Sequence, residues 1–169
     1  MKRHKSPKKH KTRRHKGFSL IELLIVVAII LIIAAIAIPN FLRSRVAANE
    51  ASAVASLHTL DTAEFTYNTT YPSVGFTGLA ALGPVSGGAS PTSAAAALID
   101  GNLASGTKSG YAFTVTPGSG TPAPNYESTA APVTPGTSGQ RYFCSDISGV
   151  IQFNVSAAIT TCGTGTTPI

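Results

Sequence analysis

An unbroken apolar run near the N-terminus limits the folds that this chain can adopt. Residues 18–38 read FSLIELLIVVAIILIIAAIAI, and only Ser19 and Glu22 among these 21 residues are polar. As an α-helix the run would rise about 31 Å, which matches the hydrocarbon core of a bilayer. A helix that is apolar all round needs a dry environment on every side, so the run predicts a membrane-length helix.

The insertion free energy favours this interpretation despite the carboxylate. Fifteen of the 21 residues are Phe, Leu, Ile or Val. Each contributes about −0.3 to −0.6 kcal/mol on an insertion scale, which sums to about −7 kcal/mol. An acidic residue costs about 3 kcal/mol at the bilayer centre and less near a helix end, where Glu22 lies. The sequence therefore predicts a transmembrane segment over residues 18–38.

The charge of the chain is concentrated in front of this segment. Residues 1–17 hold nine of the thirteen Lys and Arg and no acid, whereas the remainder has four basic residues against seven acidic ones. Basic residues beside a membrane segment hold that end in the cytoplasm. Nucleic-acid binding by this leader is disfavoured, because it has no aromatic residue for base stacking and it adjoins the apolar run.

A second helical pattern follows Pro39. A proline inside a helix removes one hydrogen bond and bends the axis, and here the helical periodicity resumes after it. Apolar residues recur at three-, four- and seven-residue spacing, which indicates an amphipathic helix. These residues are Val46, Ala53, Leu57, Leu60, Ala63 and Tyr67. We expect one long helix from Phe18 to about Asn68, ended by Tyr71-Pro72.

From Tyr71 onward the composition changes to Gly, Ser, Thr, Pro and Ala. Residues 83–93 indicate a loop, and Ala94–Leu103 a short helix with Ser93 as its cap. β-Type residues predict four strands. They are Tyr111–Thr116, Tyr126–Ala131, Arg141–Ser145 and Val150–Val155, with a turn at Asp146–Gly149. The proline-rich stretch over residues 117–139 is expected to be a surface excursion around the second of these strands.

Together these patterns predict an α+β fold. A small antiparallel sheet packed on the amphipathic half of the helix would bury both apolar faces. The expected organisation is a basic leader over residues 1–17, a transmembrane helix over 18–38, its amphipathic continuation over 39–70 and a globular β-rich region over 71–169.

Two cysteines, Cys144 and Cys162, lie near the C-terminus. An even, sparse count in an exported chain favours one disulfide, and two unpaired buried thiols are the alternative. No other ligand cluster accompanies them at the spacing of a zinc site, so we expect no metal and no cofactor. Catalytic residues are not expected either, because no nucleophile elbow or phosphate loop is present and His58 falls on the amphipathic helix.

The string KGFSLIE at residues 16–22 carries the most specific signal. It resembles the prepilin cleavage and methylation motif of type IV pilins and of type II secretion pseudopilins, and the close match covers about residues 16–45. The resemblance implies that a prepilin peptidase cuts between Gly17 and Phe18 and methylates the new terminus. It also implies that Glu22 is the assembly carboxylate and that Pro39 bends the helix.

By this resemblance the chain is a filament subunit and not an enzyme. The implied partners are the prepilin peptidase and methyltransferase, membrane lipid, identical and related pilin subunits, and an inner-membrane assembly platform. The implied location is the bacterial inner membrane, with a cytoplasmic leader and a periplasmic C-terminal region, and then an extracellular pilus or a periplasm-spanning pseudopilus. Adhesion, motility and DNA uptake are the roles that such filaments perform.

Two alternatives remain open on the sequence. A pseudopilin of a type II secretion system shares the motif, although only three acids, Asp100, Glu127 and Asp146, occur where its calcium ligands would lie. An ordinary exported protein would instead be cut after Ala35-Ile36-Ala37, leaving Ile38 first, and Arg13-Arg14 hints at a twin-arginine signal. The apolar run is about twice as long as such signals need.

Overall fold

The computed structural model describes residues 17–169. The predicted leader therefore lies outside the described residues, except for Gly17. The chain divides into two compact units, of which the first ends at Pro39 and the second begins at Asn40. Helix α1 extends over Leu20–Thr70 and contains Pro39.

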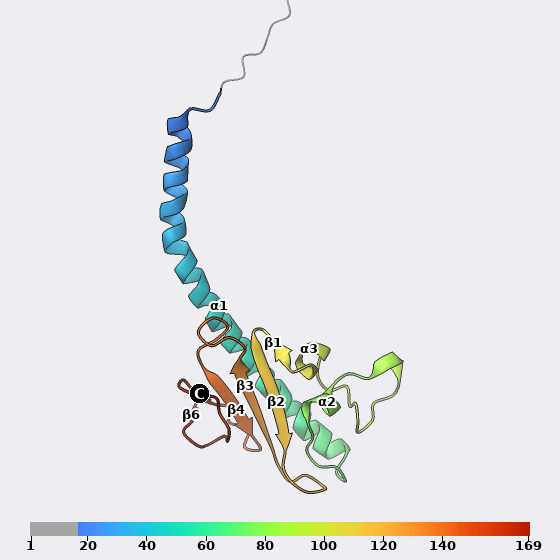
Figure 1. Ribbon diagram of the computed structural model, residues 1–169. Helices are drawn as coiled ribbons and strands as arrows, with labels where there is room; N and C mark the ends of the chain where they lie inside the picture. Colours follow the sequence, from blue (N-terminus) through green and yellow to red (C-terminus); the bar gives the residue numbers. More distant parts are fainter. Residues whose placement is uncertain (1–16) are drawn as a thin grey trace, which may run out of the picture. The chain divides into compact units, whose positions relative to one another are not determined.

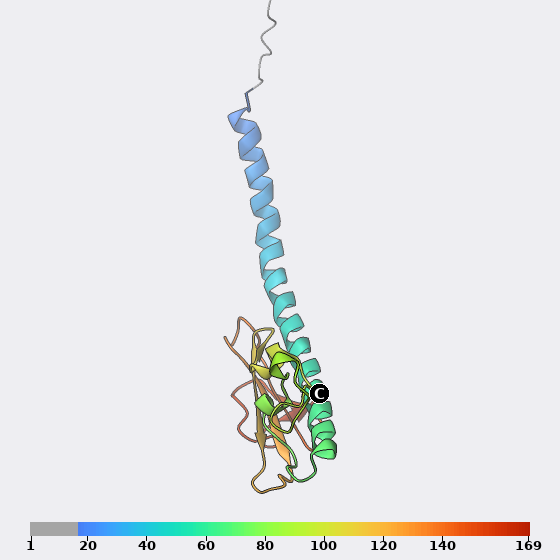
Figure 2. The same cartoon turned by 90° about the vertical axis from the view of Figure 1, so that its right-hand side faces the viewer.

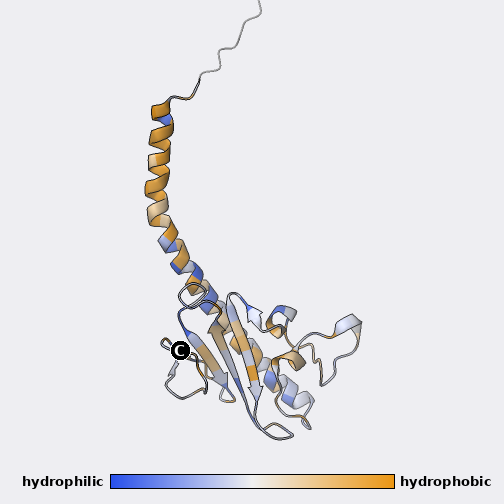
Figure 3. Cartoon of the chain, in the orientation of Figure 1, coloured by the Kyte–Doolittle hydropathy of each residue, from blue (hydrophilic) through white to orange (hydrophobic). Residues whose placement is uncertain are grey.

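The described part of the first unit is the apolar beginning of α1. Figure 3 shows this segment coloured as hydrophobic along its length, with one hydrophilic position near its start. Its large apolar side chains are exposed on every side, from Phe18 at 84% to Ile38 at 58%. No described residue of this unit supplies a core that could cover them.

The second unit contains a six-stranded antiparallel sheet in sequence order, β1-β2-β3-β4-β5-β6. The strands are β1 Thr107–Lys108, β2 Tyr111–Pro117, β3 Tyr126–Pro132, β4 Tyr142–Asp146, β5 Gln152–Asn154 and β6 Thr167–Pro168. The longest pairing joins β2 to β3, with Tyr111 opposite Pro132 and Pro117 opposite Tyr126. Each strand lies beside its neighbour in sequence, as in a meander (Figure 1).

The second half of α1 packs on one face of this sheet, which both views show (Figures 1 and 2). The strands alternate, so that Tyr111, Phe113 and Val115 of β2 are buried between exposed neighbours. Five of the six predicted stripe residues of the helix are buried in the same core, namely Ala53, Leu57, Leu60, Ala63 and Tyr67. Val46 is half-buried. The predicted α+β fold is confirmed.

All four predicted strands are present, with ends shifted by one or two residues. The turn between β4 and β5 is also present, since the Gly149 N–H donates to the Asp146 carbonyl at 2.9 Å. Gly149 has a φ of +69°, the left-handed region that a glycine adopts without a steric penalty. The two-residue strands β1 and β6 are too short to leave a sequence pattern.

The predicted helix over Ala94–Leu103 is wrong. The helix present is α3, Gly101–Ala104, and its cap is Asp100, whose carboxylate accepts from the N–H groups of Asn102 and Leu103. Ser93 caps nothing. The residues before α3 are not helical, because the Ala96 N–H donates to the Ala81 carbonyl and the Leu98 N–H to the Leu82 carbonyl, and Ala97 has a φ of +55°. Carbonyl groups of helix α2, Leu79–Leu82, thus accept from N–H groups that a helix over Ala94–Leu103 would need for its own hydrogen bonds.

The predicted loop over residues 83–93 contains one short 3-10 helix, η1, at Ser86–Gly88.

Candidate processing and assembly site

Ser19 and Glu22 form the beginning of α1. The Ser19 carbonyl accepts the first helical bond, from the Leu23 N–H at 3.2 Å, so Ser19 stands at the helix cap. Glu22 lies three residues further on, and its Oε2 accepts from the Ser19 N–H at 2.9 Å. This is the glutamate half of a capping box, in which the side chain satisfies a backbone donor that the helix leaves free.

Sequence reasoning missed the role of Ser19. The signal was available, because Ser-x-x-Glu at residues 19–22 has the spacing of a capping box. A negative charge in the first helical turn is also favoured by the helix dipole. Glu22 therefore has a local structural role in the uncleaved chain in addition to any role in assembly.

Gly17 has no structural reason to be glycine within the described chain. No atom lies within 4 Å of the position that a Cβ would occupy there. The next residue, Phe18, is 84% exposed and precedes the helix. A requirement for glycine at this position would therefore have to come from a molecule that approaches the backbone from outside.

Among residues 17–169 only α1 is long and apolar enough to cross a membrane. Its most apolar 18-residue window has a mean hydropathy of 3.3, and none of that window is buried within the protein. Water is a poor solvent for this surface, because each Å² of apolar area left exposed forgoes about 25 cal/mol. The segment can become stable by entering lipid or by packing against other apolar helices.

Comparison with known proteins places this segment among prepilins. Residues 12–38 match the family model described as the prokaryotic N-terminal methylation motif. The chain is 53% identical over 51 residues to the type IV major pilin protein PilA of Myxococcus xanthus. It is 56% identical over 46 residues to the type IV wide pilus major component PilA4 of Thermus thermophilus.

In its N-terminal segment the chain is type IV pilin-like. The two matches cover 30% and 27% of this chain, and 23% and 35% of the respective relatives. The chain thus spans about a quarter to a third of the curated relatives that it matches. No solved structure matches the pilin-like chain significantly. The likeness to these two pilins therefore covers less than a third of the chain.

Glu50 of the pilin-like chain ties α1 to the connection between β3 and β4. Its Oε1 accepts from the N–H groups of Gln140 and Arg141, and its Oε2 accepts from Arg141 Nε at 2.8 Å. Burial alone would raise the pKa of Glu50, but these hydrogen bonds and the guanidinium charge outweigh it and lower the pKa. The side chain is a buried carboxylate with its counter-charge in place.

Asp61 and Glu64 are also buried, one helical turn apart on α1. Asp61 accepts from Tyr126 Oη at 3.0 Å and from Ser145 Oγ at 2.8 Å, and burial still raises its pKa. Glu64 accepts only from the Thr77 N–H, and its Oε1 has no hydrogen-bond partner among the described residues. Burial, helped by the charge of Asp61, raises the pKa of Glu64 to about 7.

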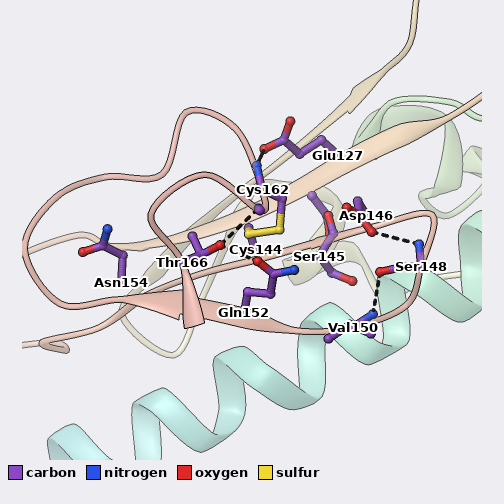
Figure 4. Close-up of a disulfide and its surroundings, with 12 residues drawn as sticks. Glu127, Cys144, Ser145, Asp146, Ser148, Val150, Gln152, Asn154, Cys162 and Thr166 are labelled. Atoms are coloured by element: carbon purple, nitrogen blue, oxygen red, sulfur yellow. Dashed lines mark hydrogen bonds between the residues drawn. A yellow bond between two sulfur atoms is a disulfide. The ribbon is translucent and has the colours of Figure 1, made fainter. Parts of the chain in front are cut away.

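A disulfide joins Cys144 of β4 to Cys162 in the C-terminal segment, with a Cα–Cα distance of 5.8 Å (Figure 4). Cys144 is fully buried. Beside the bridge, Glu127 of β3 accepts from the Cys162 N–H at 2.5 Å. The C-terminal segment is thus fastened to two neighbouring strands.

The described residues contain no group of three or more His, Cys, Asp and Glu that could hold a metal ion. Asp100 forms an ion pair with Lys108 at 2.9 Å, whereas Glu127 and Asp146 lie opposite each other on β3 and β4. His58 is exposed on α1. These side chains do not form the ligand cluster that a calcium site requires.

Proposed function

We propose that the chain is a structural subunit of a type IV pilus-like filament and is stored in the inner membrane before assembly. The observation that carries this proposal is the exposed apolar helix that follows Gly17-Phe18 and begins at the capping box of Ser19 and Glu22. While the subunit is stored in the membrane, lipid would cover this helix. In a filament the same surface would pack against the helices of other subunits. Both settings are dry, so the apolar surface would not meet water.

Proteolytic processing would prepare the helix for packing in a filament. A prepilin peptidase would cut between Gly17 and Phe18, and its methyltransferase activity would methylate Phe18. The cut removes nine basic residues, which otherwise would keep that end at the cytoplasmic surface. The open space around Gly17 supports access to the backbone at this point. An inner-membrane assembly platform would then take the subunit from the bilayer.

Glu22 would set the register between subunits. In the uncleaved chain the Ser19 N–H donates to one carboxylate oxygen, and this bond does not neutralise the charge. A buried charge without a counter-charge costs several kcal/mol. The amine of Phe18 that cleavage creates on a neighbouring subunit would supply the counter-charge. Apolar packing provides most of the attraction but tolerates sliding, whereas an ion pair is satisfied in one register.

Two variants separate the charge of Glu22 from its cap. Glu22→Gln keeps a side-chain oxygen for the Ser19 N–H and removes the charge, since glutamine also serves in a capping box. Glu22→Leu removes both the charge and the side-chain oxygen that accepts from the Ser19 N–H. We expect both variants to enter the membrane and to be cleaved, and both to yield at least ten-fold fewer filaments in the sheared surface fraction.

The membrane-fraction subunit is the internal control, because normal amounts there assign the loss to assembly. Wild-type filament yield from Glu22→Gln would contradict the ion-pair role, even if Glu22→Leu formed none.

A further inference from the structure

Four Lys and Arg residues remain in the described part of the chain. Two of them have a carboxylate partner, since Lys108 contacts Asp100 at 2.9 Å and Arg141 contacts Glu50 at 2.8 Å. Arg43 and Arg45 form no salt bridge within residues 17–169. Both belong to α1, a few residues beyond the apolar run.

Each of these arginines lines a hollow of the second unit. Arg43 lines one of about 480 Å³, with Leu42, Val46 and Ala47 along the helix and Gly136, Thr137 and Gln140 across from them. Arg45 lines another of about 400 Å³, formed with residues of β1 and of the connection between β3 and β4. Thr137 lines both hollows. The first hollow thus combines an apolar wall with one free guanidinium group.

Glu50 also lines the first hollow, but its charge is already compensated. Its oxygens accept three hydrogen bonds, from the Gln140 N–H, the Arg141 N–H and the Arg141 side chain. The hollow therefore keeps the positive charge of Arg43 as its unpaired charge. A ligand that fits would have an anionic group for the guanidinium and an apolar portion for the helix wall.

Arg43 lies only a short distance along the chain from the apolar run. Arg43 follows Ile38 by five residues, which is about 8 Å of helical rise. The headgroup region on each side of a bilayer is about 5–8 Å thick. Between Ile38 and Arg43, Phe41 and Leu42 are 67% and 51% exposed, and Asn40 is the one polar side chain.

We propose that the hollow lined by Arg43 binds the phosphate-bearing headgroup of an anionic phospholipid while residues 18–38 span the membrane. A guanidinium group matches two phosphate oxygens with two N–H groups. Arg45, in the neighbouring hollow, strengthens the attraction to the same surface. The inference rests on the membrane-stored state of the proposed function.

A second copy of the chain is the less favoured occupant. The acids of the described chain are largely in use, because Glu50, Asp61 and Glu64 are buried and Asp100 is paired. Glu22, which the proposed function pairs with an amine, and Glu127 and Asp146 of the sheet are the acids that remain for an arginine from another copy. Lipid phosphates, in contrast, would be available to Arg43 if residues 18–38 are inserted, because only five residues separate Arg43 from Ile38. After removal of the leader, Arg43 and Arg45 would be the unpaired basic side chains left beside the bilayer.

A photo-crosslinking amino acid in place of Thr137 tests the occupant directly. The full chain is inserted into vesicles of phosphatidylcholine with or without phosphatidylglycerol, illuminated and analysed by mass spectrometry. We expect a phosphatidylglycerol adduct at position 137, and about a five-fold loss of it for each of Arg43→Gln and Arg45→Gln, the effect of one basic residue near an anionic surface. Inorganic phosphate added to the solution cannot itself form a lipid adduct, and it should not reduce the yield of the phosphatidylglycerol adduct.

Lys108→Gln is the matched control, because Asp100 already neutralises that cation. It should leave the adduct unchanged, although Lys108 lines the same hollow as Arg45. An adduct that persists in the double arginine variant, a crosslink to a second copy, or no lipid adduct from inserted protein would overturn the inference. Insertion is scored separately by resistance to alkaline extraction, and failure there would count against the proposed function instead.

Discussion

At the scale of single residues, the buried carboxylates of α1 have very different environments. Glu50 accepts three hydrogen bonds, one of them from a guanidinium group, whereas Glu64 has one backbone donor and an unpartnered oxygen among the described residues. The ionised form of Glu64 is therefore poorly stabilised, and the neutral acid is the less costly form in the folded protein. The stability of the fold should consequently depend on pH.

We expect the free energy of unfolding to fall as the pH rises from about 4.5 to about 7 and then to level off. The folded pKa of Glu64 is about 7 against an ordinary 4.5, so over this range the unfolded chain has released a proton that the folded chain keeps. The loss should reach about 3 kcal/mol, at about 1.4 kcal/mol per pKa unit. Urea unfolding of the full chain in detergent at several pH values measures it.

Neighbouring groups affect the two ends of this curve. The raised pKa of Asp61 adds to the loss just above pH 4, and the lowered pKa of Glu50 costs stability below about pH 4.5. Glu64→Gln should flatten the curve between pH 5 and 7, while Glu127→Gln, a half-exposed control, should keep the slope. An equal slope in wild type and Glu64→Gln would show that another group is responsible.

Gly17 provides a second test at this scale. Because a Cβ at this position meets open space, Gly17→Leu should not disturb α1 or the sheet. If the peptidase needs the bare backbone, the same variant should remain uncleaved in the membrane, heavier by the 17-residue leader. Intact mass measurement of the membrane fraction distinguishes the two forms. Gly17→Ala, which adds only a methyl group, is the control of intermediate size. Mature-sized protein from Gly17→Leu would refute the assignment of the cleavage site.

At the scale of elements, the C-terminal segment depends on the disulfide more than on the sheet. Strand β6 contributes two residues, and much of residues 155–169 is exposed. The bridge encloses 17 residues between Cys144 and Cys162, which in the chain-entropy model stabilises the folded state by about 3 kcal/mol. The Glu127 bond to the Cys162 N–H holds the same point from β3.

We expect Cys144→Ala/Cys162→Ala to lower the free energy of unfolding by about 3 kcal/mol. The change should appear as a lower urea midpoint, and reduction of the wild type should shift it in the same direction. Glu127→Gln is the comparison, since its amide oxygen can still accept from the Cys162 N–H. A double variant with the wild-type midpoint would mean that the segment is held by other contacts.

The sequence predicted the elements well where their periodicity was strong. The apolar run, the helical stripe and the alternating strands are local patterns that need no knowledge of distant partners. The buried acids were missed because their donors are remote in sequence. Arg141 lies 91 residues from Glu50, and Ser145 lies 84 from Asp61. Helix α3 was misplaced for a similar reason, since carbonyl groups of α2 accept from the N–H groups of Ala96, Leu98 and Ile99.

Only part of the candidate site was predictable from the sequence. Gly17, Phe18 and Glu22 stand in a short motif that sequence alone identifies, and the family model matches the same stretch. The Ser19 contribution required the observed hydrogen bond to become evident, although its spacing was present. Arg43 and Arg45 could not be distinguished from other basic residues until the partners of Lys108 and Arg141 were known.

At the scale of the whole molecule, the two units meet different requirements. The second unit buries its own core between α1 and the sheet, so it can be stable in water. The described part of the first unit has no core and needs lipid or other copies of itself. A leader cut before the apolar helix would keep that helix on the mature protein, whereas a signal-peptidase cut after it would discard the helix.

The N-terminal residue of the mature subunit tests this proposal most directly. Subunits recovered from sheared surface filaments would be analysed by N-terminal sequencing and intact mass. We expect the chain to begin at Phe18 and to carry one additional methyl group on its amine. A mature chain that begins at Ile38, or a surface protein that still begins at Met1, would contradict it.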